Sequence, residues 1–216
     1  MLSTEPLAYF DISPEVSEKT AVFPGDSPYR RIVAQDFAKG DSLALSSLST
    51  TVHIGAHADA PSHYHPQGQD ISKRSLDYYF GPCQVVAVRL PRGRRIMPDD
   101  IDLGKITAKR LLFKTGSFPD PDHWNDDFNS LSPELIDALA RRKVVLVGID
   151  TPSIDPEDSK ALESHQAVYR GDMAVLEGLI LDGVPEDVYD LVALPLRLKG
   201  ADASPVRAIL IKRTDA

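Results

Sequence analysis

The segment that decides the local fold is His53-Ile-Gly-Ala-His57-Ala-Asp59-Ala-Pro61-Ser-His63, which places imidazole and carboxylate side chains on odd-numbered positions. Side chains of a strand point alternately to two faces, so an extended backbone brings His53, His57 and Asp59 to the same face. Imidazole nitrogen and carboxylate oxygen are ligands that zinc and similar divalent metals accept. The spacing therefore predicts a metal site on a strand.

Pro61 predicts the end of that strand. Proline cannot donate to a strand ladder and disfavours helix for the residue before it, so we expect His63 to turn back over the site. A helix is the alternative, because His53 and His57 have the i,i+4 spacing of HExxH metalloproteases. Ile54 stands where that motif needs Glu, and Gly55 and Pro61 both disfavour helix.

Composition limits the class of protein. The chain has 216 residues, of which 42% are hydrophobic and 26% charged, as in folded globular proteins. We expect a single domain over residues 1–216. The formal net charge of -8 argues against nucleic acid and anionic membranes as partners, and no apolar run approaches the roughly 20 residues that span a bilayer.

Cysteine content and the N-terminal residues predict a cytoplasmic location. The single cysteine, Cys83, cannot form an internal disulfide, which fits a reducing compartment. We expect it to be a small buried hydrophobic residue. The first residues, Met-Leu-Ser-Thr-Glu-Pro, show neither a basic stretch nor an apolar leader segment.

The order of expected elements predicts an α/β fold. Ser132 and Pro133 begin a helix signature, with acid early and base late, that leads into the apolar run Val144–Asp150. A weaker helix is expected at Asp158–His165, and a short one at Pro98. Strand-length apolar runs occur at Tyr9–Ile12, Arg31–Phe37, Leu43–His53, Gln84–Leu90, Leu111–Thr115, Val144–Ile149, Leu191–Leu198 and Val206–Ile211.

Two residues of the C-terminal half are candidates for further metal ligands. His165 is one, and Glu177 is the other, a carboxylate inside the otherwise apolar run Met173–Leu181. Burying a carboxylate is costly unless it is paired or bound to a cation. Glu177 is therefore either a metal ligand or the buried partner of an ion pair. His123 and Trp124 lie in an irregular polar stretch, where we expect surface packing.

The chain resembles the metal-dependent cyclase-like hydrolases, whose motif is H-x-G-T-H-x-D-x-P-x-H. The segment His53–His63 carries this motif, and four more blocks follow the family's order along nearly the whole chain. They are Phe23-Pro-Gly-Asp26, Gly148-Ile-Asp150-Thr-Pro-Ser-Ile-Asp-Pro156, Leu176-Glu177-Gly178 and Asp202-Ala-Ser-Pro-Val-Arg207.

The resemblance implies a fold and a site. The fold is a layered β/β/α domain of the α/β class with mixed or parallel and antiparallel sheets, assembled as a homodimer. The site holds two divalent metal ions, usually zinc with manganese possible. One ion is held by His53, His57 and Asp59, and Asp59 also bridges to the second. The remaining assignments are His165 and Glu177 as ligands of the second ion, His63 as general acid/base and Phe23 as a substrate contact.

The resemblance also implies an activity, the hydrolysis of N-formyl-L-kynurenine, a small aryl formamide, to L-kynurenine and formate in tryptophan degradation. Two positions depart from the family pattern: Ala56 replaces the usual Thr, and Phe23 replaces the usual Trp, which removes an indole N–H donor. A cyclic-amide hydrolase acting on isatin is one alternative. A structural metal-binding protein, which would unfold on chelation, is another.

Overall fold

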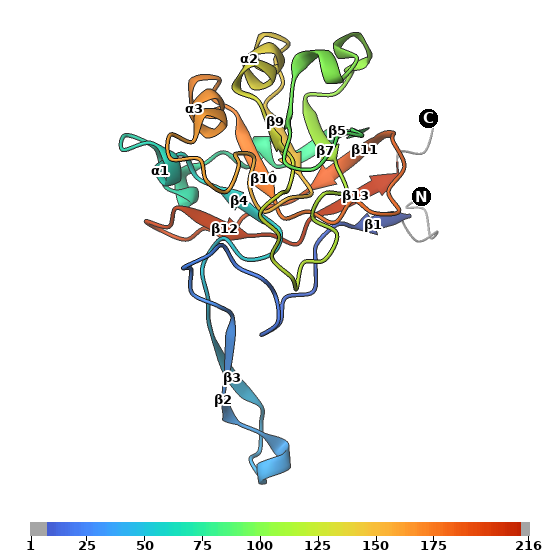
Figure 1. Ribbon diagram of the computed structural model, residues 1–216. Coiled ribbons are helices and arrows are strands. Elements are labelled where there is room, and N and C mark those ends of the chain that lie inside the picture. The colour runs from blue at the N-terminus through green and yellow to red at the C-terminus, as the bar shows by residue number, and fades with distance from the viewer. Residues whose placement is uncertain (1–7, 213–216) are drawn as a thin grey trace, which may run out of the picture.

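A computed structural model describes residues 8–212. Its centre is a curled, mixed sheet of nine strands in the order β1-β13-β11-β5-β7-β9-β10-β4-β12 (Figure 1). The strands are β1 Tyr9–Asp11, β2 Arg30–Gln35, β3 Leu45–Ser49, β4 His57–Asp59, β5 Phe80–Ala87, β6 Arg95–Ile96, β7 Arg110–Lys114, β8 Ser130–Leu131, β9 Leu146–Ile149, β10 Ala174–Glu177, β11 Val188–Val192, β12 Ala203–Pro205 and β13 Ile209–Lys212. The helices are α1 Pro61–Tyr64, α2 Pro133–Arg141 and α3 Glu163–Arg170, with short 3-10 turns at Phe37–Lys39, Ile71–Lys73, Leu76–Tyr78, Pro98–Asp100 and Leu103–Lys105.

The middle of the sheet is parallel and its two sides are antiparallel. Strands β5, β7, β9 and β10 pair in parallel, whereas β4 pairs antiparallel with both β10 and β12. Helices α2 and α3 lie on one side of the sheet (Figure 1). Two buried clusters result, one between the sheet and these helices and one on the opposite face. This arrangement confirms the expected layered α/β fold.

Helix α2 forms where its sequence signals predict. The Ser132 side chain accepts a hydrogen bond from the Leu135 N–H, and Pro133 occupies the first turn. Leu135, Ile136 and Leu139 share the buried face of the helix. Cys83 is fully buried in β5, as expected for a small hydrophobic residue.

Helix α3 begins at Glu163, five residues later than the sequence predicts. Its free N–H groups at Ser164 and His165 donate to the carboxylate of Asp155, which is not adjacent in sequence. Leu162, directly before the helix, has a left-handed backbone with φ of 48°. A cap supplied from this distance leaves no local sequence signal, so the predicted start was wrong.

The predicted strand over His53–Pro61 is also shorter than expected. Only His57–Asp59 pairs as a strand, β4, and residues 52–56 form turns and bends. Gly55 has φ of 57°, a left-handed conformation that glycine adopts easily and that breaks the alternation of faces. His57 and Asp59 keep the predicted common face, but His53 reaches them from a turn. Pro61 ends the strand as predicted and begins α1.

Strands β2 and β3 form a hairpin that projects away from the rest of the chain (Figure 1). The pair forms its own two-stranded sheet and does not join the nine-stranded one.

None of the helices within residues 8–212 has the length and hydrophobicity that crossing a bilayer requires.

Gly178, which follows β10, makes a close backbone approach near the site. A Cβ at this position would lie 2.2 Å from the Gly55 carbonyl oxygen, and its φ is 64°. We expect Gly178→Ala to lower the free energy of unfolding by about 1–2 kcal/mol for the left-handed backbone and by about 1–3 kcal/mol more for the clash. Urea unfolding measures the loss.

Gly183→Ala provides the matched control. Gly183 has φ of 70° but no atom within 4 Å of its Cβ position, so only the backbone contribution should be lost. Equal losses for the two variants would show that the contact between Gly178 and Gly55 contributes nothing.

Candidate metal centre and active site

The pairing of β4 with β10 brings two predicted ligands together. Glu177 lies opposite His57 in the antiparallel register, and Val175 lies opposite Asp59. The Nε2 atom of His57 is 3.3 Å from Oε2 of Glu177. The strand register therefore places a carboxylate from the C-terminal half beside the central histidine of the motif.

The remaining predicted ligands come from a helix and a turn. From α3, His165 Nε2 lies 3.3 Å from Glu177 Oε1 and 3.4 Å from Asp59 Oδ2. From the turn before β4, His53 Nδ1 lies 3.0 Å from Asp59 Oδ1. All five predicted ligands thus converge, with Asp59 at the centre.

The donor set fits divalent metal ions. Two groups, each with donor atoms within 4.8 Å of one another, share Asp59: one contains His53 and His57, the other His165 and Glu177. Within the described chain, His57 Nε2, His165 Nε2 and both Asp59 carboxylate oxygens are buried without a hydrogen-bond partner. Such orphaned polar atoms are costly unless a cation binds them. Imidazole and carboxylate in this mixture suit zinc or manganese.

The close approach of carboxylates and imidazoles shifts the pKa values of these groups. Burial opposes the charged form of His53, but the nearby carboxylates of Asp59 and Asp202 outweigh it and raise its pKa to about 9. Burial likewise opposes charge on His165, whose carboxylate neighbours raise its pKa well above the ordinary value. For Asp59, the surrounding histidines overcome burial and lower the pKa. Positive charge is therefore favoured at the centre of the cluster.

The two alternatives for Glu177 can be compared directly. The residue is 3% exposed, and its carboxylate accepts a hydrogen bond from the Ile154 N–H. Its ionic neighbours in residues 8–212 are the imidazoles of His57 and His165, and no Lys or Arg pairs with it. This environment favours the metal-ligand alternative over a simple buried ion pair.

His63 lies at the open side of the cluster, on α1. Its side chain is 33% exposed, and Nδ1 is 3.3 Å from Oδ2 of Asp202. Its ring centre is 4.2 Å from that of His53. The same Asp202 oxygen is 3.1 Å from His53 Nε2, so one carboxylate contacts both histidines. The sequence indicated Asp202 only as part of a family block and gave it no role.

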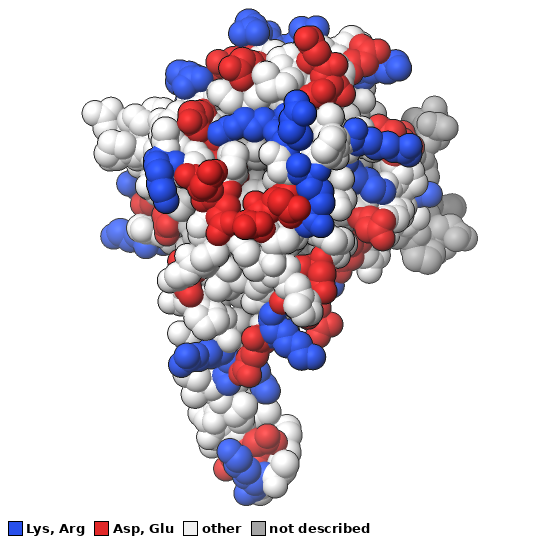
Figure 2. All heavy atoms as spheres, in the orientation of Figure 1, with Lys and Arg blue, Asp and Glu red and all other residues white. Residues whose placement is uncertain are grey.

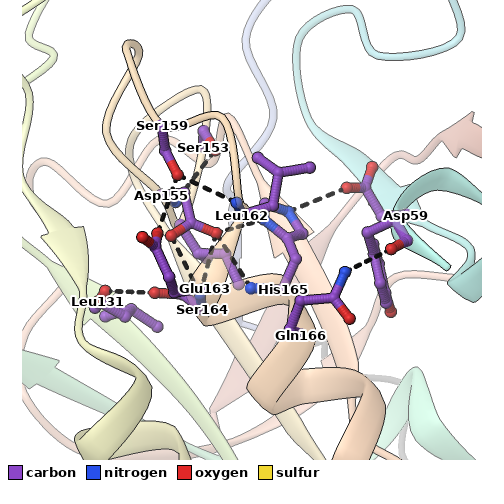
Figure 3. A network of polar contacts seen from close by, with 12 residues as sticks. Asp59, Leu131, Ser153, Asp155, Ser159, Leu162, Glu163, Ser164, His165 and Gln166 are labelled. Atoms are coloured by element: carbon purple, nitrogen blue, oxygen red, sulfur yellow. Dashed lines mark hydrogen bonds and ion pairs between the residues drawn. The ribbon is translucent and has the colours of Figure 1, made fainter.

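Asp155 supports His165 from the side away from the other donors. It is fully buried. Its Oδ2 lies 2.8 Å from Nδ1 of His165, and its Oδ1 accepts a hydrogen bond from Arg95 at 2.9 Å. Figure 3 shows this network, with His165 lying between Asp155 and Asp59. Because Nδ1 is engaged by Asp155, Nε2 is the nitrogen left to face Asp59 and Glu177.

A cavity of about 430 Å³ opens beside the cluster, and His53, His57, His63, His165 and Glu177 contribute to its lining. Three aromatic side chains that contact one another also line the cavity: Phe23, Phe118 and Trp124. The rings of Phe23 and Trp124 pack edge to face with centres 5.2 Å apart. The expectation that Trp124 only packs on the surface was therefore incomplete, since it also brings an indole to the cavity. His123 is exposed, as expected.

The cavity lining also carries charged side chains outside the donor cluster. Lys160 is the one Lys or Arg among the lining residues, and Glu157 lies on the same segment between Asp155 and α3. Lys160 makes no ion pair with any residue of the described range. Neither residue stood out in the sequence, because a loop of mixed charges is ordinary at a protein surface.

Comparison with known proteins gives sequence relatives. A family model described as "Putative cyclase" matches residues 10–156. Kynurenine formamidase from Bordetella petrii is 46% identical over 202 residues, which cover 93% of this chain and 96% of that protein. Kynurenine formamidase from Maricaulis maris is 41% identical over 203 residues, with 93% and 96% covered.

Solved structures share the fold. The structure of a "predicted metal-dependent hydrolase" from Bacillus stearothermophilus has a TM-score of 0.82 and 27% identity, covering 97% of this chain and 100% of that chain. Isatin hydrolase A from Labrenzia aggregata, bound to benzyl benzoate, has a TM-score of 0.80 at 21% identity, with 95% and 93% covered. At 21% identity the likeness concerns the fold alone.

Asp155→Asn tests the support of His165. The amide keeps the shape of the side chain but weakens its hold on Nδ1, so we expect metal affinity to fall about 10- to 100-fold. Isothermal titration of metal-free protein with Zn²⁺ measures this fall without an activity assay. The control is Glu163→Gln, which removes an exposed partner of Arg95 and leaves the Asp155–His165 contact in place. Unchanged affinity in Asp155→Asn would disprove the supporting role.

Proposed function

This chain belongs to the cyclase family, alongside the kynurenine formamidases, and from this membership we propose that it hydrolyses N-formyl-L-kynurenine to L-kynurenine and formate as a step of tryptophan degradation. The chain is a hydrolase. The observation that carries the proposal is the pair of donor groups that share Asp59, beside a cavity that is also lined by aromatic side chains. A cytoplasmic location is part of the proposal and agrees with the unpaired Cys83.

We assign two divalent metal ions to the cluster, most simply zinc, with manganese as the alternative. His53, His57 and Asp59 would hold the first ion. Asp59, His165 and Glu177 would hold the second. Ions bound there would supply hydroxide at neutral pH and polarise the formyl oxygen of the substrate.

His63 is proposed as the general acid/base. Water adds to the formyl carbon, and the carbon–nitrogen bond to the aniline nitrogen then breaks. His63 would take the proton from the attacking water and deliver it to the departing nitrogen, which gives formate and a free aniline. Its partly exposed position on α1, with Nδ1 toward Asp202, leaves Nε2 available for this transfer.

The cavity walls support an aryl substrate with an amino acid end. Phe23, Phe118 and Trp124 offer apolar ring faces and edges for the aromatic ring. Trp124 places an indole next to Phe23, the position where the family pattern usually has Trp. Lys160 and Glu157 also line the cavity, where Lys160 would pair with the substrate carboxylate and Glu157 with its ammonium group.

Substitutions of His63 and Asp59 separate catalysis from metal binding. We expect His63→Asn to keep full metal content and to lose turnover by about 100- to 10,000-fold. Asp59→Ala should empty both sites, because one carboxylate serves both donor groups. Elemental analysis combined with formate release from N-formyl-L-kynurenine measures both effects.

The unaltered protein, assayed on N-formyl-L-kynurenine and on isatin in parallel, is the reference for these variants. Full metal occupancy without formate release would disprove the proposed substrate while leaving the metal centre intact. Metal loss in His63→Asn would make His63 a ligand, and full metal content in Asp59→Ala would exclude the shared carboxylate.

Lys160→Met tests the recognition of the amino acid end. We expect KM for N-formyl-L-kynurenine to rise about 10- to 100-fold, since a hydrogen bond to a charged group contributes about 1.5–3 kcal/mol. KM for formanilide, which lacks the amino acid group, should stay the same. Lys105→Met, at an exposed position outside the cavity, is the control. Parallel losses on both substrates would refute this contact.

A further inference from the structure

Asp202 is one of many exposed acidic residues, but its contacts set it apart. Figure 2 shows Asp and Glu side chains spread over the visible face of the molecule, with Lys and Arg among them. The side chain of Asp202 is 50% exposed, and its ionic partners within residues 8–212 are two histidines. Its Oδ2 atom lies 3.1 Å from Nε2 of His53 and 3.3 Å from Nδ1 of His63. One carboxylate oxygen therefore contacts both a candidate metal ligand and the proposed acid/base.

Main-chain contacts fix the position of Asp202. The next residue, Ala203, lies opposite Asp59 in the antiparallel pairing of β12 with β4. The Asp202 carbonyl oxygen accepts a hydrogen bond from the Ala60 N–H at 2.8 Å. Ala60 directly precedes α1, and its own carbonyl oxygen accepts from the His63 N–H at 2.9 Å. The backbone of Asp202 thus holds the start of the short helix whose histidine ring its side chain contacts.

The ring of His53 lies between two carboxylates. Its Nδ1 atom is 3.0 Å from Oδ1 of Asp59, on the side of the donor groups, whereas Nε2 faces Asp202. His53 comes from the turns before β4, where no strand pairing orients its side chain. An imidazole that binds a metal through one nitrogen donates its other N–H, and a carboxylate on that N–H fixes the orientation of the ring. Asp202 is therefore placed to support His53 as Asp155 supports His165.

The ring of His63 has the same relation to Asp202. Its side chain is 33% exposed, and its ring centre lies 4.2 Å from that of His53. In a neutral imidazole one nitrogen donates and the other accepts, so the partner of one decides the role of the other. When Nδ1–H donates to Asp202, Nε2 is left as the acceptor that proton transfer requires.

A third metal ion is the alternative use of these side chains. The donor atoms of His53, His63 and Asp202 lie within 4.8 Å of one another. His53 faces Asp59 with Nδ1, however, so that with an ion bound there its Nε2 keeps a proton and cannot bind another ion. Both contacts of Asp202 have the length of hydrogen bonds, and one carboxylate oxygen can accept two of them. The geometry favours two hydrogen bonds over a further ion.

We propose that Asp202 is a positioning residue that sets the ring nitrogens of His53 and His63 together. It accepts the Nε2–H of His53, so that Nδ1 faces the donor cluster, and the Nδ1–H of His63, so that Nε2 accepts the proton in the cavity. One side chain thereby couples metal binding to proton transfer. The effect on turnover rests on the proposed function, whereas the arrangement of ring protons does not.

Asp202→Ala removes the carboxylate and keeps the main-chain contact with Ala60. Long-range ¹H–¹⁵N spectra of the zinc-loaded protein, recorded in alkaline buffer, report which ring nitrogen carries the proton. We expect His63 to carry it on Nδ1 in the unaltered chain and to shift in the variant toward the Nε2–H form that free histidine prefers. The same proton distribution in both proteins would overturn the proposal.

Turnover is compared on two leaving groups at saturating Zn²⁺. Aniline leaves formanilide only with a proton, whereas 4-nitrophenolate leaves 4-nitrophenyl formate without one. We expect Asp202→Ala to lower kcat on formanilide about 10- to 100-fold at unchanged KM and to affect the ester much less. In a His63→Asn background the same change should cause no further loss on formanilide, because the two residues act as a unit. Equal losses on the two substrates, or losses that add in the double variant, contradict positioning through His63.

Zn²⁺ titration of the metal-free protein separates the effect on His53. We expect the affinity of Asp202→Ala to fall about ten-fold, the low end for a residue that supports a ligand, because this carboxylate is half exposed. The number of ions bound per chain should stay the same. Unchanged affinity would remove His53 from the proposal, and the loss of one ion per chain would replace positioning by a third metal site.

Asp137→Ala is the matched control. Asp137 lies on α2 outside the cavity, its side chain is 41% exposed, and it pairs with Arg170. This variant should leave the spectra, the Zn²⁺ affinity and both kcat values unchanged. An unaltered chain that gives the expected spectra but does not hydrolyse N-formyl-L-kynurenine refutes the proposed function and leaves the arrangement of ring protons standing.

Discussion

Buried negative charge governs the organisation of this molecule around its site. Asp59 and Glu177 lie on adjacent strands, are almost fully buried and face the same imidazole of His165. Two carboxylates taken out of water so close together destabilise a fold unless positive charge lies between them. The histidines supply some of that charge, and bound cations would supply the rest. The register of β4 with β10 is thus both a feature of the sheet and the basis of the proposed chemistry.

Asp155 shows how closely fold and site depend on each other here. Its carboxylate accepts the free N–H groups at the start of α3 and also holds the ring of His165 on that helix. The side chain that starts the helix therefore also selects which histidine nitrogen faces the other donors. A change at this position affects the helix start and the metal site together, and neither can be altered separately.

Local signals in the sequence account for the parts that were predicted correctly. The spacing of His57 and Asp59, the stop at Pro61 and the cap at Ser132 each act within a few residues. Residue type and apolar context made His165 and Glu177 candidate ligands, and the family resemblance assigned them to the second ion. They converge with His53 only through long-range pairing. The features that the sequence did not predict depend on residues far apart in the chain. The start of α3 depends on Asp155, and the contact of Trp124 with Phe23 depends on how two irregular segments pack.

The position of β4 in the sheet has a consequence for biosynthesis. This short strand lies between β10 and β12, whose residues leave the ribosome more than one hundred positions after it. Until they emerge, both edges of β4 stay open, and His57 and Asp59 lack the contacts that Glu177 and His165 provide. Contacts so distant along the chain form slowly, and a nascent chain with open strand edges is prone to aggregate. Metal loading would consequently belong to the end of synthesis, after β10 and β12 have paired with β4.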